Sequence, residues 1–216
     1  MKRLGAPPYI CLITKGESDP SNYASQKPKI LETIREAAAD GVHLIQIREK
    51  ALSARLLFDL VSDAVRIAAK TGSLIVVNDR ADISIASGAD GVHLPGNSIS
   101  PKLVRNTFAS ELVIGVSTHS VEQARLAAES GADYVFFGPI FETPGKPKPV
   151  GPGVLENVCS QLGTFPVIAL GGIDQNNVKQ VLRAGAAGIA AIRALNEKES
   201  RRSILKVVAE TARNMR

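Results

Sequence analysis

A short opening of small residues followed by an apolar run recurs along the chain, and this repeat constrains the fold more than any other feature. Each copy starts with glycine or alanine, passes through small or acidic residues, and continues into aliphatic or aromatic side chains. The copies lie at residues 88–94, 131–137 and 185–192, with a looser copy at residues 39–45. A glycine that ends a helix just before a short apolar strand marks one unit of an alternating α/β chain. The sequence therefore predicts a protein built from a repeated helix–strand unit.

Eight short apolar runs alternate with segments of helical spacing, at residues 9–13, 44–47, 74–77, 91–94, 113–116, 134–137, 167–170 and 188–192. Strands that are apolar on both faces are typical of parallel sheets covered by helices. In a chain of 216 residues, these units predict the α/β class and a (β/α)8 TIM barrel, near the lower size limit of that fold. A doubly wound open sheet is the alternative, but none of the runs has the weaker composition of an edge strand. No linker divides residues 1–216, so a single domain is expected.

The helix after the seventh run has recognisable ends. Asp174 is its predicted N-cap and Gly185 its predicted C′ residue, because aspartate favours the first position and glycine tolerates the left-handed backbone of the second. The most irregular connections are residues 15–27 and 142–153, and both come directly after predicted strands. Long loops at the catalytic face of a barrel are candidate mobile lids.

The balance of basic and acidic residues bears on which binding partners the sequence favours. The chain has 26 Lys and Arg against 21 Asp and Glu, a formal charge of +5. A nucleic-acid partner is not expected, because the sequence lacks interleaved aromatic residues and a recognisable base-reading motif. A phosphorylated small substrate accounts equally well for a locally positive site. The basic residues near the C-terminus have the spacing of one solvated helix face; they are Arg201, Arg202, Lys206, Arg213 and Arg216.

Cysteine content and hydropathy predict a soluble, cytoplasmic protein. Cys11 and Cys159 lie among apolar neighbours in a predicted strand and a predicted helix, which is typical of buried thiols in a reducing compartment. Residues 1–8 contain no apolar stretch long enough for a signal peptide, and no window of the chain approaches the length of a membrane span, so no membrane partner is expected. A homo-oligomer is compatible with the sequence, which does not determine the oligomeric state.

Polar and charged side chains follow several predicted strands at their carboxyl ends, where barrel enzymes hold their sites. Arg48 and Lys50 are predicted to alternate along the end of the second strand, so both could point toward the barrel mouth, although a surface pair is equally compatible. Asp79 beside Asn78 could bind a metal or only cap a helix. His119 follows the fifth strand, where a hydrogen-bonded structural role is the ordinary alternative to catalysis.

The glycine pair after the seventh strand suggests a second kind of site. Gly171-Gly172 could be only a tight turn, but the loops after strands seven and eight of barrels commonly bind phosphate through backbone N–H groups. Arg193, at the end of the eighth strand, would add a bidentate phosphate contact. Ile192, the residue before it, belongs to the same predicted substrate-binding set.

Together these residues predict one pocket with two anion sites. Arg48, Lys50 and Lys146 supply cations, while Asn78 and Asp79 supply an amide and a carboxylate. A diphosphate needs cations and usually Mg²⁺, which accepts one or two carboxylates together with substrate oxygens and water. The glycine pair would hold a second, monophosphorylated substrate. The expected chemistry is group transfer between two phosphorylated small molecules, with diphosphate as the leaving group.

Several short motifs in these positions resemble the thiamin phosphate synthase and TenI family. They are residues 47–50, 77–79, 91–94, 115–120, 137–141 with Thr143 and Lys146, and 169–173, and they run in family order across nearly the whole chain. The resemblance implies a (β/α)8 barrel that acts in thiamin biosynthesis. Its synthase branch joins hydroxymethylpyrimidine diphosphate to a thiazole phosphate and releases diphosphate, whereas its TenI branch tautomerises a thiazole carboxylate phosphate.

The resemblance also implies roles for the matched residues. The diphosphate and Mg²⁺ set comprises Arg48, Lys50, Asn78, Asp79 and Lys146. Ser117 and Thr143 would lie against the reacting rings, Gly172 would take the thiazole phosphate, and His119 matches the acid/base histidine of the tautomerase. The expected catalytic residues are thus Lys50, Lys146, Ser117 and His119; the expected substrate-binding residues are Arg48, Asn78, Thr143, Gly171, Gly172, Ile192 and Arg193; the expected metal ligand is Asp79.

Two departures from the family pattern bear on the reaction. Ser98 stands where the synthase pattern has an aspartate that is its second Mg²⁺ ligand, and Arg193 stands where the family usually has a small serine. The missing carboxylate resembles TenI, yet the retained cations and Asp79 form a diphosphate clamp for which a tautomerase has no use. We therefore favour the synthase; a thiazole tautomerase and a non-catalytic regulator that binds thiazole phosphate are the alternatives.

Overall fold

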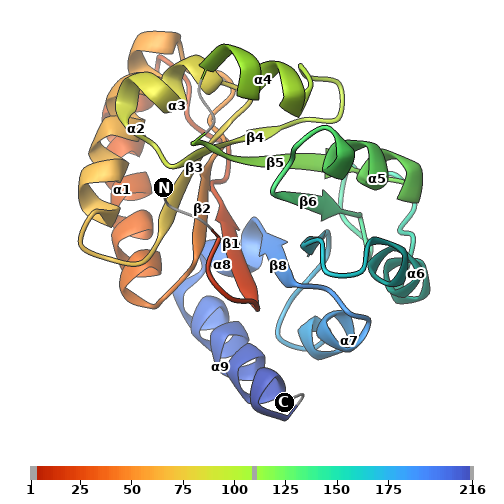
Figure 1. Ribbon diagram of the computed structural model, residues 1–216. Helices are drawn as coiled ribbons and strands as arrows, with labels where there is room; N and C mark the ends of the chain where they lie inside the picture. Colours follow the sequence, from red (N-terminus) through yellow and green to blue (C-terminus); the bar gives the residue numbers. More distant parts are fainter. Residues whose placement is uncertain (1–3, 109–110, 215–216) are drawn as a thin grey trace.

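The computed structural model describes residues 4–108 and 111–214, and within them the strands close into a barrel (Figure 1). All eight strands are parallel and pair in chain order, with β8 beside β1. The prediction of a (β/α)8 barrel is confirmed, and the open sheet is excluded because each of these strands pairs on both sides. The strands are β1 Tyr9–Ile13, β2 Leu44–Ile47, β3 Leu74–Asn78, β4 Gly91–Leu94, β5 Val113–Thr118, β6 Tyr134–Phe137, β7 Val167–Leu170 and β8 Gly188–Ala191.

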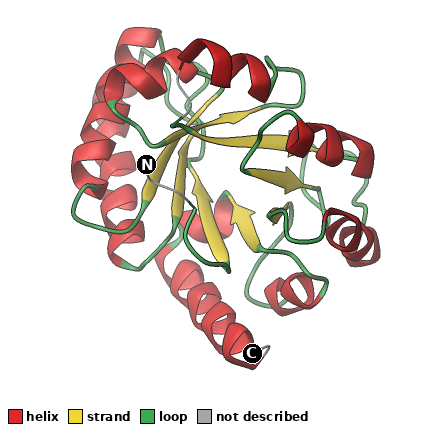
Figure 2. Ribbon diagram, viewed as in Figure 1, coloured by secondary structure: helices red, strands yellow, loops and turns green. Residues whose placement is uncertain are grey.

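Helices surround the strands as an outer layer (Figure 2). Within the described ranges, no helix combines the length and the apolar character needed to cross a membrane. The helices are α1 Tyr23–Ala39, α2 Ala54–Ala68, α3 Ala81–Ser87, α4 Pro101–Phe108, α5 Val121–Glu129, α6 Pro152–Leu162, α7 Val178–Arg183, α8 Arg193–Asn196 and α9 Lys198–Asn214.

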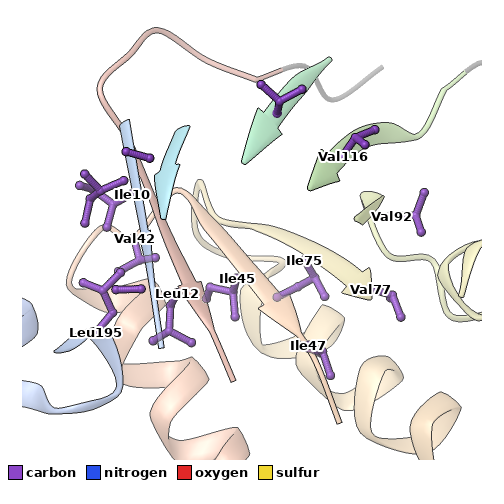
Figure 3. Close-up of a cluster of buried hydrophobic side chains, with 14 of the residues drawn as sticks. Ile10, Leu12, Val42, Ile45, Ile47, Ile75, Val77, Val92, Val116 and Leu195 are labelled. Carbon is purple, nitrogen blue, oxygen red and sulfur yellow. The ribbon is translucent and has the colours of Figure 1, made fainter. Parts of the chain in front are cut away.

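The strands divide their side chains between two cores, because successive residues of a strand point to opposite faces. In β1, Ile10 and Leu12 pack outward against the helices, whereas Tyr9, Cys11 and Ile13 point into the barrel. Figure 3 shows part of the outer core, where aliphatic side chains of neighbouring strands lie in one layer facing the helices. Burying one such Leu or Ile side chain stabilises the fold by about 1.5–3 kcal/mol. The two cores explain why the strands are largely apolar on both faces.

Arg201 of α9 is fully buried, so the prediction that the basic C-terminal residues share one solvated face is wrong for this residue. Its guanidinium donates to the carboxylates of Asp40 (2.9 Å) and Glu36 (3.2 Å) and to the carbonyl of Leu195 (3.1 Å). These contacts fasten the last helix to α1, the first. Arg202 is more than half exposed and donates to the other oxygen of Asp40. Arg216 lies outside the described residues.

Replacing Arg201 by alanine is expected to lower the free energy of unfolding by about 3 kcal/mol, because it removes a fully buried guanidinium together with its bonds to Asp40, Glu36 and the Leu195 carbonyl. Arg202→Ala is the matched control, since it removes an exposed guanidinium from the same Asp40 carboxylate and should cost no more than about 1 kcal/mol. Urea denaturation of both variants measures the difference. Equal losses of unfolding free energy in the two variants would show that the buried Arg201 stabilises the fold no more than the exposed Arg202 does.

The same bridge gives the protein a defined dependence on acid. Burial disfavours the charged form of Asp40, but hydrogen bonds from Arg201 and Arg202 outweigh it and lower the pKa of this carboxyl. A carboxyl with a lowered folded-state pKa contributes its full stabilisation above its unfolded pKa of about 3.9 and loses it as the pH falls through the folded value. The stability gap between wild type and Asp40→Asn should therefore narrow as the pH is lowered below about 4.

Several boundaries differ from the sequence predictions. The strands β3 and β5 run one and two residues further, to Asn78 and Thr118, and β8 ends at Ala191, one residue early. Asp174 is not the N-cap of α7, which is Asn177; Asp174 instead caps the preceding turn by accepting from the N–H of Asn176. The predicted loops are shorter, since α1 begins at residue 23 and α6 at residue 152. Gly185 does follow α7 with a left-handed φ of 88°, as predicted.

Neither cysteine forms a disulfide. Cys11 is fully buried inside the barrel, as predicted, whereas Cys159 on α6 is only partly buried. Burial raises the pKa of the Cys159 thiol to about 11. Both side chains therefore stay protonated near neutral pH and act as small apolar groups.

Candidate active site

The residues singled out from the sequence follow the carboxyl ends of the strands, so the closed parallel barrel brings them to one end of the molecule. Arg48, Asp79 and Lys146 follow β2, β3 and β6 and are not scattered over different faces. Three local groups form this end: a cavity beside β2 and β3, a hydrogen-bonded set inside the barrel, and the glycine pair after β7.

A cavity of about 290 Å³ lies beside the ends of β2 and β3. It brings together Lys50, Asn78 and Asp79, three of the residues predicted to bind a diphosphate and its metal. Leu52 and Leu57 form an aliphatic part of the wall, and the remaining lining comes from Ile47, Glu49 and Arg80. The cavity therefore offers a cation, an amide and a carboxylate beside an apolar surface. The other predicted site residues lie outside this lining.

Asp79 has a left-handed backbone with φ of 61°, and it is the only non-glycine residue with a positive φ in the described part of the chain. Its N–H donates to the carbonyl of His93 (2.9 Å), and one carboxylate oxygen accepts a hydrogen bond from the Ser98 hydroxyl. This conformation costs a non-glycine residue about 1–2 kcal/mol, and such strain concentrates at functional sites. The N-cap of α3 is Arg80, without a side-chain capping bond, so the interpretation of Asp79 as a helix cap is wrong.

Oxygen atoms suited to a hard cation gather around Asp79. Besides its carboxylate, the Ser98 hydroxyl is in contact with it, and the side chain of Asn78 precedes it, with its amide oxygen accepting from Gln46 (3.1 Å). Across residues 4–108 and 111–214, no three His, Cys, Asp or Glu residues come together as a metal site. A metal ion bound here would therefore have Asp79 as its one protein carboxylate and would need further oxygen ligands from a bound substrate.

The prediction that Arg48 and Lys50 alternate along a strand is wrong, because β2 ends before both of them. Arg48 is half-buried and Lys50 is exposed in the following turn. Glu49, between them, is buried, and its carboxylate accepts from the N–H groups of Gly16 (3.1 Å) and Ser18 (2.9 Å). Glu49 thus ties the β1–α1 connection to the end of β2, a role that was missing from the sequence analysis.

Ser117 is the one predicted catalytic residue that lies on a strand, near the end of β5. Its Oγ is 2.8 Å from Nε2 of His93, and Nδ1 of His93 is 3.2 Å from the hydroxyl of Tyr134. Burial lowers the pKa of His93 to about 3, so the imidazole is neutral near pH 7. His93 was not among the predicted site residues, although a polar side chain at an inward position of an otherwise apolar strand is a signal that could have identified it.

His119 is exposed, and its Nδ1 lies 2.5 Å from the carbonyl oxygen of Gly138. Since a carbonyl only accepts, Nδ1 carries the proton of this bond. In the neutral ring, Nε2 is then free to accept a proton. The backbone N–H of His119 donates to Gln123 (2.8 Å), which fixes the position of the residue at the end of β5.

Gly171 and Gly172 have positive φ values of 105° and 62°. A Cβ at Gly172 would lie 2.6 Å from the carbonyl oxygen of Glu142, so the close approach of the β6–α6 connection also requires glycine here. Asn177 supports the turn, because its side chain donates to the carbonyl of Gly172 (2.8 Å) and accepts from the N–H of Asp174 (2.9 Å). Successive backbone N–H groups in a turn can form a concavity that binds anions, so the role of this glycine pair as the phosphate-binding element stays a prediction.

The β6–α6 connection lies against this glycine pair. The N–H of Phe141 donates to the carbonyl of Gly171 (3.0 Å). Two residues on, the Thr143 hydroxyl donates to the carbonyl of Phe141 (3.0 Å), and the N–H of Lys146 donates to the carbonyl of Thr143 (3.1 Å). The predicted catalytic Lys146 is exposed at the tip of this connection.

Ile192 and Arg193 stand where β8 passes into the short α8. Ile192 is the N-cap of α8 and is half-buried, while Arg193 is its exposed first residue. No ion pair within the described chain occupies the side chains of Arg48, Lys50, Lys146 or Arg193. The mouth of the barrel therefore carries cations that are available to an anionic ligand.

Fold and site together describe a (β/α)8 barrel of the kind that enzymes use, with cationic side chains and a cavity at the carboxyl ends of its strands. The family model described as thiamine monophosphate synthase matches residues 10–195. The chain belongs to this family, as its motifs indicated.

Curated relatives and solved structures agree with that assignment. The chain is 37% identical over 196 residues to the thiamine-phosphate synthase of Chlorobium luteolum, a match that covers 89% of this chain and 87% of the relative. It is 38% identical over 192 residues to a putative thiamine-phosphate synthase of Geobacter sulfurreducens, covering 86% and 90%. The solved thiamine phosphate pyrophosphorylase of Pyrococcus furiosus superposes with a TM-score of 0.81 at 29% identity, covering 94% of this chain and 96% of that one.

The strain at Asp79 can be separated from the function of its carboxylate. Asp79→Gly and Asp79→Ala both remove the carboxylate, so both should lose the same share of any activity that depends on it. Only the glycine relieves the left-handed backbone, and Asp79→Gly is therefore expected to be more stable than Asp79→Ala by about 1 kcal/mol. Thermal unfolding of the two variants measures this difference, and equal stability would mean that the backbone at residue 79 is unstrained.

Proposed function

We propose that this protein is a thiamine-phosphate synthase, which joins hydroxymethylpyrimidine diphosphate to a thiazole phosphate and releases diphosphate. The observation that carries the proposal is the cavity in which Lys50, Asn78 and Asp79 meet. A synthase needs such a group to hold a diphosphate, whereas a tautomerase has no diphosphate to bind. The activity is also the one in the names of the relatives from Chlorobium luteolum and Pyrococcus furiosus.

The residues around Asp79 fit a Mg²⁺ ion, because carboxylate, hydroxyl and amide oxygens are the ligand types that this cation takes. Asp79 would hold the ion, Ser98, which contacts it, would contribute a hydroxyl oxygen, and Asn78, which lines the same cavity, would contribute an amide oxygen directly or through water. When bound, Mg²⁺ supplies positive charge that offsets the negative charge developing on a departing diphosphate. With one protein carboxylate, phosphate oxygens of the substrate would complete its coordination.

The chain's own residues would then accelerate the reaction mainly by positioning the substrates and by stabilising the negative charge that develops on the diphosphate. Lys50, at the cavity, and Lys146, on the β6–α6 connection, would neutralise charge on the leaving diphosphate, with Arg48 binding the same group. The aliphatic wall formed by Leu52 and Leu57 would exclude water from the reactive pyrimidine carbocation left behind, so that the thiazole nitrogen captures it.

The second substrate would bind on the opposite side of the mouth. Gly171 and Gly172 would receive the thiazole phosphate, with Arg193 as an added cation and Ile192 against the bound molecule. Thr143 would lie against the reacting rings, on a connection that is hydrogen-bonded to Gly171 through Phe141. This arrangement supports a pocket with the two phosphorylated groups apart and the two rings together.

A thiazole tautomerase is the second candidate, favoured by the geometry of His119. Its Nδ1–H donates to the carbonyl of Gly138, which leaves Nε2 free to move a proton on a bound ring. The serine at position 98 also weakens the case for a metal. A tautomerase would need neither Mg²⁺ nor Lys50.

Diphosphate release from the two synthase substrates, measured with and without Mg²⁺, tests the proposal. Lys50→Ala should slow the chemical step by about 10²-fold or more, since it removes a preorganised charge from the leaving group. Lys29→Ala, the same substitution at an exposed position of α1, should leave the rate unchanged.

Turnover of a thiazole carboxylate tautomer in EDTA that His119→Ala abolishes would instead establish the tautomerase. Tight binding of thiazole phosphate with neither reaction would establish the regulator.

Restoring a carboxylate beside Asp79 should strengthen metal binding. Ser98→Asp places a second acidic group where the Ser98 hydroxyl now contacts Asp79, and added ligand charge raises affinity for a hard cation. We expect the Mg²⁺ dependence of diphosphate release to shift to lower metal concentration, by about tenfold. Ser98→Asn, which adds bulk without charge, is the matched control. An unchanged dependence in Ser98→Asp would place the ion elsewhere.

The remaining expectations follow from this activity and stay predictions. Small phosphorylated substrates are the expected partners, with no nucleic acid and no membrane. A cytoplasmic location and a homo-oligomeric state also stay predictions.

A further inference from the structure

Three neighbouring strands place a line of hydrogen-bonding groups inside the barrel, below the mouth. His93 of β4, Ser117 of β5 and Tyr134 of β6 all point inward, and β4, β5 and β6 lie side by side (Figure 1). The line runs from the Tyr134 hydroxyl to Nδ1 of His93 (3.2 Å) and from Nε2 of His93 to Oγ of Ser117 (2.8 Å). Its inner end is fully buried, while Ser117 is half-exposed at the mouth.

The rings of this line are held tightly in place. The His93 imidazole packs on Phe136 with ring centroids 4.1 Å apart, and the Tyr134 ring lies 5.7 Å from it. Gly115 pairs with Tyr134 across β5 and β6, and a Cβ at Gly115 would fall 2.4 Å from the Tyr134 hydroxyl oxygen. The phenol therefore occupies the space that a side chain at residue 115 would need. The glycine is what lets the hydroxyl reach His93.

The direction of each hydrogen bond follows from the donors available. A tyrosine hydroxyl has one proton to donate, and in the described part of the chain the only hydrogen-bond partner of the Tyr134 hydroxyl is Nδ1 of His93. If Nδ1 carried a proton, the buried Tyr134 hydroxyl would have no acceptor, at a cost of about 1–3 kcal/mol. The proton of the neutral ring therefore sits on Nε2, which donates to Ser117. The Ser117 hydroxyl already accepts, so its own proton is free to point out of the barrel.

We propose that His93 is a positioning residue which, held by Tyr134, directs the Ser117 hydroxyl toward the substrate as a hydrogen-bond donor. The inference rests on the proposed function for the acceptor, an oxygen of the departing diphosphate or an atom of the pyrimidine. This role of Ser117 is the opposite of that of a serine nucleophile. A nucleophilic serine needs a histidine nitrogen that accepts its proton, whereas Nε2 of His93 already carries a proton and cannot accept another. No covalent bond forms and no proton leaves the line.

Nuclear magnetic resonance of the wild-type protein tests the direction without any assay of activity. Long-range ¹H–¹⁵N correlation of histidine rings distinguishes the Nε2–H from the Nδ1–H tautomer, and His93→Gln assigns the signal. We expect His93 to be the Nε2–H tautomer at neutral pH. His119, whose Nδ1 faces the Gly138 carbonyl, should give the opposite pattern and serves as the internal reference. An Nδ1–H tautomer at His93 would overturn the inference whether or not the protein is a synthase.

A double-mutant cycle tests the link to Ser117. Ser117→Ala should slow single-turnover diphosphate release by about 10²-fold, the usual loss for one preorganised donor. His93→Leu, which keeps the bulk but has no N–H, should slow it by about tenfold or more with little change in substrate KM. His93→Gln should recover part of that loss, because its amide can still donate to Ser117.

The double variant separates positioning from a general structural effect. If His93 acts through Ser117, His93→Leu in the Ser117→Ala background should cause no further loss. If the double variant instead slows diphosphate release by the product of the two single-variant factors, the inference is wrong. Circular dichroism and thermal unfolding check that each variant is folded, and if His93→Leu does not fold, the cycle is run with His93→Gln. Wild-type protein that releases no diphosphate would refute the proposed function but leave the tautomer measurement valid.

Discussion

Closure of the barrel between its first and last strands is the constraint on which the candidate site depends. Tyr9 of β1 pairs with Gly188 of β8, where a Cβ would lie 2.1 Å from the Tyr9 carbonyl oxygen, so a side chain would hold the strands apart. Because eight short strands share one ring, their carboxyl ends meet around a single opening. Arg201 extends the closure to the outer layer by joining α9 to α1 through Asp40 and Glu36. Residues from distant parts of the sequence thereby face one ligand.

The site itself combines rigid and adjustable parts. Asp79 is held in a strained backbone between its bonds to the His93 carbonyl and the Ser98 hydroxyl. Glu49 anchors the connection after β1 through two backbone amides. By contrast, Lys50 and Lys146 are exposed and have no ionic partner in the described chain. A ligand would thus meet a fixed carboxylate and movable cations, which suits a substrate whose charge shifts as the reaction proceeds.

Much of the fold could be predicted because its repeat is local. Each strand is a short, largely apolar run, and several are preceded by a glycine that ends a helix, so neighbouring residues were enough to place all eight strands. Burial of polar residues was harder, since it depends on partners distant in sequence. Arg201 has the spacing of a surface residue, and only its contact with Asp40 reveals that it is buried.

Some residues of the candidate site could likewise be identified from the sequence, and others could not. Residues directly after strands, such as Lys50 and Asp79, could be identified because their position alone brings them to the mouth. His93 and Glu49 could not, because their importance lies in what they contact across the barrel and not in their place along it. The tautomers of His93 and His119 are a further example, since each is set by a neighbour on an adjacent strand or connection.

The fit between Gly115 and Tyr134 has a consequence for how this protein can change over time. Because the phenol fills the volume that any side chain at residue 115 would need, residue 115 must stay glycine as long as the ring at 134 is present. A larger residue at 115 becomes tolerable only after the ring at 134 has been lost, and with it the polar anchor of His93. Among descendants of this chain, a residue larger than glycine at 115 should therefore occur only where the ring at 134 is absent, and that change would mark a lineage in which the interior of the barrel has a different role.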